Sequence, residues 1–185
     1  MPDTTLGITY PSSTSAVNIP GDMQVLALDV DALLTLLVTK PKFVITQVGV
    51  AQNMPNATWT SVTFNTDVID SANGHDTAVN TSRYTVQAGH GGLWQLQAKF
   101  SWDGSTTGRR LGRYLVNGAS VVAGSEHSVP PSATALLAPM VTALVQLSAG
   151  DYVEFQQNQD SGATRTTFSG TSDSGAMFSG VRLSS

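Results

Sequence analysis

The sequence predicts an all-β sandwich or jelly roll, preceded by a short helix that associates with copies of itself. Two patterns lead to this fold class. Apolar and polar residues alternate along short runs separated by turn dipeptides after residue 43, and a heptad pattern occupies residues 22–38. The 185 residues therefore divide into an extended arm over residues 1–21, a helical segment over 22–40 and a head domain over 43–185.

The arm contains turn residues but no sustained hydrophobic periodicity. Tyr10-Pro11 and Pro20-Gly21 are typical of turns and loops. A segment of this kind has little core of its own, so it is ordered mainly by docking onto a partner. We therefore expect residues 1–21 to attach the protein to something else.

The helical segment begins after Pro20-Gly21, with Asp22 placed to cap the first free amides. Apolar residues then recur at spacings of three and four, as in a coiled-coil seam. Such a short helix is marginal alone, because helix nucleation is costly. It either packs on its own domain or associates with other copies, and Lys40-Pro41-Lys42, which separates it from the head, favours association. The predicted seam consists of Met23, Leu26, Val30, Leu33 and Leu37.

The head shows its clearest strand from Trp94 to Trp102, where large apolar residues alternate with Gln, Lys and Ser. This period of two indicates a strand with one buried face. Similar alternation follows in later runs, and pairs such as Asn73-Gly74 and Asp103-Gly104 supply the turns between strands. The residues predicted for the core of the head are Trp94, Leu96, Phe100, Val153, Phe155 and Phe178.

Four short motifs occur in order along the head: Gly92 to Leu96, Tyr114 to Gly118, Val145 to Val153 and Phe178 to Leu183. Together they resemble the signatures of the globular head of complement component one q and its tumour necrosis factor-like relatives. The resemblance implies a ten-stranded jelly roll that forms homotrimers about a threefold axis lined by apolar and aromatic faces. Relatives often carry a collagen region or a long stalk, whereas here a two-heptad helix follows a short arm.

A second resemblance concerns the N-terminal part, from Leu6-Gly7-Ile8-Thr9-Tyr10-Pro11 through the helix around Asp29-Val30-Asp31. It is similar to the attachment segment of minor tail or fibre proteins of bacteriophages that infect actinobacteria. The similarity implies that residues 1–38 bind other virion proteins.

Composition restricts the partners and the compartment. The net charge is −4, with no basic cluster large enough for a nucleic-acid surface. No uninterrupted apolar stretch reaches the roughly 18 residues of a membrane span. There are no cysteines, and the N-terminus lacks the features of a secretory signal. We expect a protein on the surface of a virion, on the tail or the capsid, that becomes extracellular after cell lysis.

Catalytic and metal-binding motifs are missing from the sequence. His75, His90 and His127 lack zinc-ligand spacing and are expected to be solvated loop residues. No nucleophile elbow occurs, and Asp151 is expected to anchor a turn. The sequence therefore predicts a non-enzymatic protein without a cofactor.

Two groups of charged residues leave alternatives open. Arg109, Arg110 and Arg113 form the densest positive cluster, which either contacts an acidic ligand or keeps a strand edge from pairing. Asp67, Asp70 and Asp76 either offer oxygen ligands to calcium or form a solvated acidic loop.

These features lead to one main functional hypothesis and two alternatives. The main hypothesis is a trimeric phage fibre or spike, a minor tail or head fibre protein, whose head binds a host-surface saccharide or protein. The first alternative is a capsid decoration protein that stabilises the shell. The second is a secreted bacterial ligand-binding module of the same fold.

Overall fold

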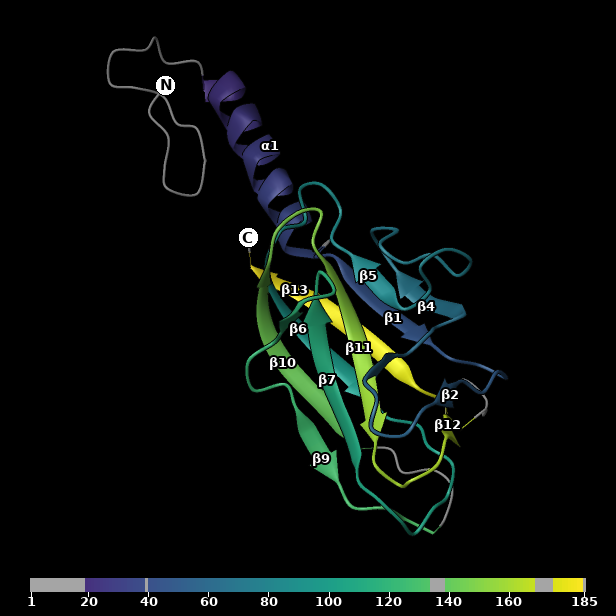
Figure 1. The fold of residues 1–185 in the computed structure, drawn as a ribbon. Coiled ribbons are helices and arrows are strands. Elements are labelled where there is room, and N and C mark those ends of the chain that lie inside the picture. Colours follow the sequence, from purple (N-terminus) through teal and green to yellow (C-terminus); the bar gives the residue numbers. More distant parts are fainter. Residues whose placement is uncertain (1–18, 39, 134–138, 169–174, 185) are drawn as a thin grey trace. The chain divides into compact units, whose positions relative to one another are not determined.

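The computed structural model describes residues 19–38, 40–133, 139–168 and 175–184 (Figure 1). The chain divides into two compact units, Met1–Lys40 and Pro41–Ser185. The first unit contributes one described helix, and the second contains all the described strands. Most of the predicted arm, residues 1–18, lies outside the described residues.

The helix α1 spans Ile19–Val38 and begins three residues before Asp22, the predicted cap. The prediction of a turn at Pro20-Gly21 is wrong, because both residues lie in the first helical turn. Proline is tolerated there, since the first amides of a helix have no partner within it. Three predicted seam residues, Met23, Leu26 and Val30, are exposed. The side chains of Leu33 and Leu37 lie outside the described part, and the coiled coil stays a prediction.

Two antiparallel sheets form the head, and the all-β jelly-roll prediction is confirmed (Figure 1). The first sheet has the order β10-β6-β13-β1-β4, so strands distant in sequence lie side by side. Its bounds are β1 Lys42–Thr46, β4 Thr66–Asp70, β6 Gly92–Lys99, β10 Met140–Leu147 and β13 Met177–Ser184.

The second sheet has the order β3-β11-β7-β8, with β5 paired to β11 and β9 paired to β7. A separate two-stranded ladder joins β12 and β2. Thirteen strands are described, whereas the resemblance implies ten. The number is higher because several short ladders of two or three residues count as separate strands. The remaining bounds are β2 Asn53–Met54, β3 Thr60–Ser61, β5 Arg83–Thr85, β7 Arg110–Val116, β8 Ser120–Val121, β9 His127–Val129, β11 Tyr152–Gln159 and β12 Arg165–Thr166.

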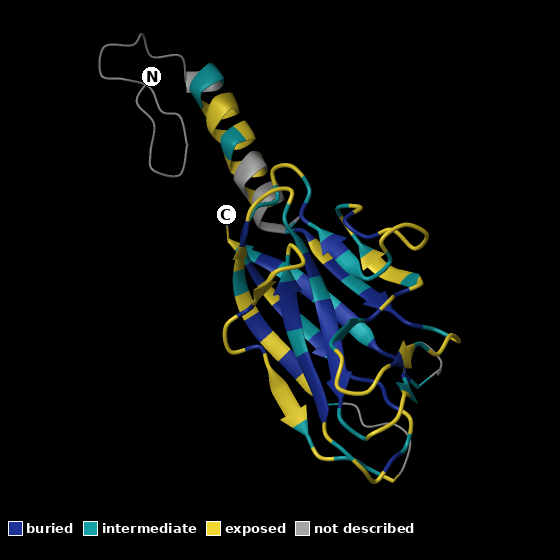
Figure 2. Ribbon diagram, viewed as in Figure 1, coloured by how far each residue is buried: buried dark blue, intermediate teal, exposed yellow. Residues whose placement is uncertain are grey.

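The core between the two sheets includes many aromatic rings. Figure 2 shows that the buried residues are concentrated in the strands of the head. Phe43 of β1 stacks on Tyr84 of β5 with ring centroids 3.8 Å apart, and Phe178 meets Phe43 edge-on at 4.9 Å. Gly180 lies beneath Phe43, where an added Cβ would come within 2.5 Å of the ring. The residues predicted for the core, Trp94, Leu96, Phe100, Val153, Phe155 and Phe178, all have 0% exposure.

At one end of the sandwich, Asp151 connects two hairpins. Its carboxylate accepts hydrogen bonds from the Ser148 amide, as expected of a turn anchor, and from the Asn117 side chain, each at 2.7 Å. These bonds, the one from Asn117 first, lower the pKa of Asp151. Asn117 in turn accepts from the Tyr152 amide at 2.9 Å and adopts a positive φ of 52°. The turn after β7 is thereby fixed against the start of β11.

Candidate interaction surfaces

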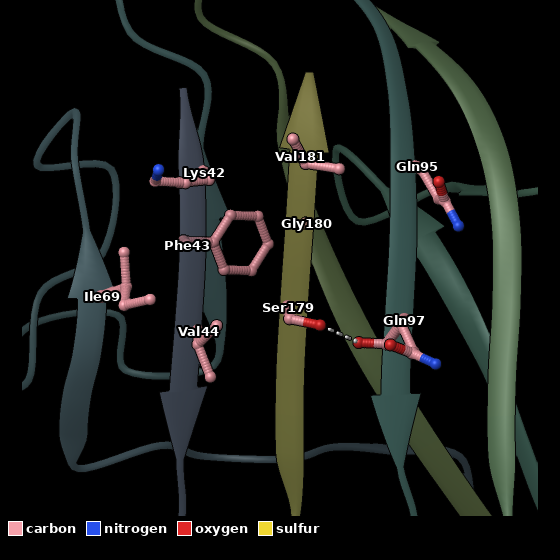
Figure 3. A pocket seen from close by; sticks show the side chains of 9 residues that line it. All are labelled: Lys42, Phe43, Val44, Ile69, Gln95, Gln97, Ser179, Gly180 and Val181. Carbon is pink, nitrogen blue, oxygen red and sulfur yellow. Dashed lines mark hydrogen bonds between the residues drawn. The ribbon is translucent and has the colours of Figure 1, made fainter. Parts of the chain in front are cut away.

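The five-stranded sheet presents an apolar surface on the face opposite the core. In β1 the buried residues Phe43 and Ile45 flank Val44, whose side chain lies on this outer face. Val44, Val181 and Ile69 line a shallow groove of about 270 Å³ across β4, β1, β13 and β6 (Figure 3). The outer face therefore has a hollow lined by three aliphatic side chains.

Strand registers define two rows of side chains across this face. A row from β10 to β1 and a neighbouring row from β10 to β4 contain no carboxylate. Leu144 in the first row is 60% exposed and Ile69 in the second is 42% exposed. We call these two rows the sheet face. They comprise Leu144, Gln95, Val181 and Lys42, and then Thr142, Gln97, Ser179, Val44 and Ile69.

The helix α1 provides a second exposed apolar surface. Leu28 and Leu34 are exposed in addition to the three seam residues with described side chains. No helix in the described part of the chain is long and apolar enough to cross a membrane. Separately, clustered exposed leucines such as Leu28 and Leu34 are typical of surfaces that bind another protein.

The three arginines singled out in the sequence have three different environments. Arg109 is exposed and pairs with Asp160, and its backbone amide and guanidinium both donate to that carboxylate, which lowers the pKa of Asp160. Arg110 is fully buried, 5.3 Å from the ring of Trp102, and donates to two backbone carbonyls. The expectation that Arg110 contacts a ligand at the surface is therefore wrong.

Arg113 is the third of these arginines, and it is partly exposed. Its guanidinium lies 4.0 Å above the ring of Trp59, and its Nε donates to Gln156 at 3.0 Å. Stacking on an aromatic ring and a hydrogen bond fix the side chain in one position. Because Arg110 is buried, the three arginines do not form one surface cluster.

In the predicted acidic loop, the carboxylates form hydrogen bonds that hold the loop in place. His75 places Nδ1 2.6 Å from Asp67 and Nε2 3.1 Å from the carbonyl of Thr81. Asp70 accepts from the backbone amide of His75, and Asp76 accepts from two amides of its own loop, which lower the pKa of Asp76. The residues that the structure describes include no group of three histidine or acidic side chains arranged to hold a metal ion.

The expectation that all three histidines are solvated is wrong for His75. Its side chain is fully buried against Asp67. His127 is exposed on β9, whereas His90 is half-buried and accepts a hydrogen bond from the Trp94 indole on its carbonyl. Sequence spacing could not reveal the His75 contact, because it depends on a loop that folds back over β4.

Comparisons with known proteins concern the fold alone. No family model matches the sequence, and no curated protein matches it. Solved structures do match. The globular domain of zebrafish complement 1qA is 20% identical with a TM-score of 0.52, over 78% of this chain and 98% of that chain. The head has the same jelly-roll fold as this domain.

Two further structures have the same fold. PRD1 vertex protein P5 is 19% identical with a TM-score of 0.52, over 80% of this chain and 99% of that chain. Eiger TNF from S. frugiperda is 11% identical with a TM-score of 0.52, over 78% of this chain and 93% of that chain. The expected fold of the head is confirmed, while the likeness of the N-terminal part to phage attachment segments stays a prediction.

Proposed function

We propose that this chain is a trimeric, non-enzymatic structural protein of a virus particle, a fibre or spike that presents its jelly-roll head to the host surface. One observation carries the proposal: α1 and the sheet face both expose apolar side chains in the single chain. Exposed apolar surface of this kind is typical of subunit interfaces. A closed threefold assembly covers both surfaces with copies of the same chain.

The composition of the sheet face supports its burial against another copy. Its two rows carry no carboxylate, and Lys42 is their one charged residue. Depletion of charge is the compositional sign of an interface centre. Gln95, Gln97 and Ser179 offer hydrogen-bonding groups beside the aliphatic residues, so the face suits a contact that is apolar but specific.

Residues 1–38 are proposed to bind other virion proteins, and the head is proposed to bind a host-surface saccharide or protein. The match to a vertex protein also favours a second placement, on the capsid shell, where the chain would act as a decoration protein. In that case the N-terminal part provides the attachment and the head stands away from the shell.

The trimer is tested by light scattering of the full chain at micromolar concentration. We expect a mass of three copies of the 19.4 kDa chain. Leu144→Asp places a charge in the sheet face and is expected to reduce the mass towards that of one copy. Val50→Asp is the matched control, because Val50 is 59% exposed and Leu144 is 60% exposed. A monomeric unmodified chain would contradict the proposal.

The placement is tested by electron cryo-microscopy of purified particles that carry the chain. Threefold density on a fibre or at the tail tip supports the host-binding spike. Threefold density on the capsid shell supports the decoration protein. Density for the chain at neither of these places would overturn both placements.

A further inference from the structure

We propose that a polar depression beside β5 binds a neutral saccharide unit, which names the ligand class of the proposed host-binding head and rests on that function. The depression has a volume of about 440 Å³, within the usual range for small-ligand sites. It lies between the loop that follows β4 and the outer side of β5. The lining residues that carry the argument are Asn73, Asp76, Val79, Asn80, Arg83 and Thr85.

The loop that forms one wall of this depression is held rigid by contacts behind it. The buried ring of His75 joins Asp67 to the carbonyl of Thr81, and Asp70 accepts from the His75 amide. Gly74 fits only without a side chain, because an added Cβ would come within 2.4 Å of the Tyr84 ring. Rigidity matters because a preformed site loses less conformational entropy on binding.

Arg83 provides a fixed set of donors in the depression. Its guanidinium lies 4.6 Å from the centre of the Tyr152 ring, and among the residues that the structure describes it forms no ion pair. The stacking contact leaves the N–H groups around the guanidinium plane free to donate. A planar fork of this kind can donate to two adjacent oxygens at once.

Asp76 provides an acceptor near these donors. Its Oδ1 accepts from the amides of Ala78 and Val79, at 2.8 and 3.0 Å, while within the described part of the chain Oδ2 accepts no hydrogen bond. The two amide bonds fix the carboxylate and lower its pKa, so it is ionised at neutral pH. The amides of Asn73 and Asn80 and the hydroxyl of Thr85 add groups that both donate and accept.

This mixture of groups matches a sugar better than an anion or an apolar molecule. Sugar hydroxyls both donate and accept, so they can pair with Arg83 and Asp76 together. Val79, which is 60% exposed, offers an apolar contact for the C–H face of a sugar ring. An anion would meet the Asp76 carboxylate and would lie near Glu154, the residue opposite Arg83 in the β5–β11 ladder.

The site is tested by saturation-transfer difference NMR on the full chain with galactose, glucose, mannose and N-acetylglucosamine, each at millimolar concentration. We expect at least one of these sugars to receive saturation from the protein. Arg83→Lys removes the planar fork and Thr85→Val removes a hydroxyl, and each should weaken binding about tenfold, as expected for the loss of hydrogen bonds. Retained near-ultraviolet circular dichroism shows that a variant is folded.

Arg113→Lys is the matched control, because Arg113 also stacks on an aromatic ring and lies on the same sheet but does not line the depression. It should leave sugar binding unchanged. Two results would overturn the proposed saccharide site. One is the absence of saturation transfer to all four sugars, and the other is an equal loss of sugar binding in the Arg83 and Arg113 variants. The mass of the same samples is read separately, so a trimer without sugar binding refutes the saccharide site alone, whereas a monomer refutes the proposed assembly.

Discussion

The imidazole of His75 lies between two acceptors, the carboxylate of Asp67 and the carbonyl of Thr81. Its backbone amide donates to Asp70. The His75 side chain thus links the loop after β4 to β4 itself, through Asp67, and to the residues before β5, through Thr81. A histidine between Gly74 and Asp76 gives no hint of this in the sequence, because the partners are set by the path of the loop.

Replacing His75 with alanine is expected to reduce the free energy of unfolding by about 1–3 kcal/mol, because both acceptors lose their buried partner. Urea unfolding of the full chain measures this loss. His127→Ala provides the control, since His127 is exposed, and its effect should stay within about 0.5 kcal/mol. Equal stabilities of the two variants would show that the His75 contacts do not stabilise the loop.

Single residues of the core were predictable where alternation was clean, but Arg110 was not. Arg110 has the same parity along β7 as Gly112 and Tyr114, and all three lie on the buried face. The alternation of side chains along β7 therefore does predict that Arg110 points into the core. Residue type obscured it, because a charged side chain is seldom fully buried and burial here also lowers the pKa of the guanidinium.

At the scale of elements, the heptad pattern predicted a helix but placed its start too late. Pro20 and Gly21 are turn residues in general, yet the first helical turn tolerates proline. The sheet face was missed for a different reason. Phe43, Val44 and Ile45 form a continuous apolar run in β1, which indicates a strand covered on both faces rather than on one.

Removing residues 1–40 is expected to leave the head folded, because the chain divides into compact units at this boundary. Near-ultraviolet circular dichroism follows the buried Trp94 and Trp102 in the truncated protein. The trimer should weaken at least about tenfold, because linked contacts raise each other's effective concentration. Sedimentation at several concentrations measures this change. An unchanged association constant would show that α1 contributes nothing to assembly.

At the scale of the whole molecule, an assembly stabilises each of its subunits by mass action. If the folded chain is a trimer, raising the protein concentration about a hundredfold should raise Tm by several degrees. Differential scanning calorimetry measures the shift. Leu144→Asp, with the contact of the sheet face disrupted, should melt at a Tm that no longer depends on concentration. A constant Tm for the unmodified chain would indicate that its subunits unfold independently.

The position of β13 has a consequence for synthesis. This strand lies between β1 and β6, and every other strand in the described part of the head precedes it in the chain. While the ribosome is still making the protein, the five-stranded sheet can exist only as two fragments, β1 with β4 and β6 with β10. Ser179 and Val181 lie in β13, so a head that still lacks this strand also lacks the middle of the sheet face that we propose binds other copies. If the sheet face forms the proposed trimer, this strand order is expected to keep heads that lack β13 out of the assembly.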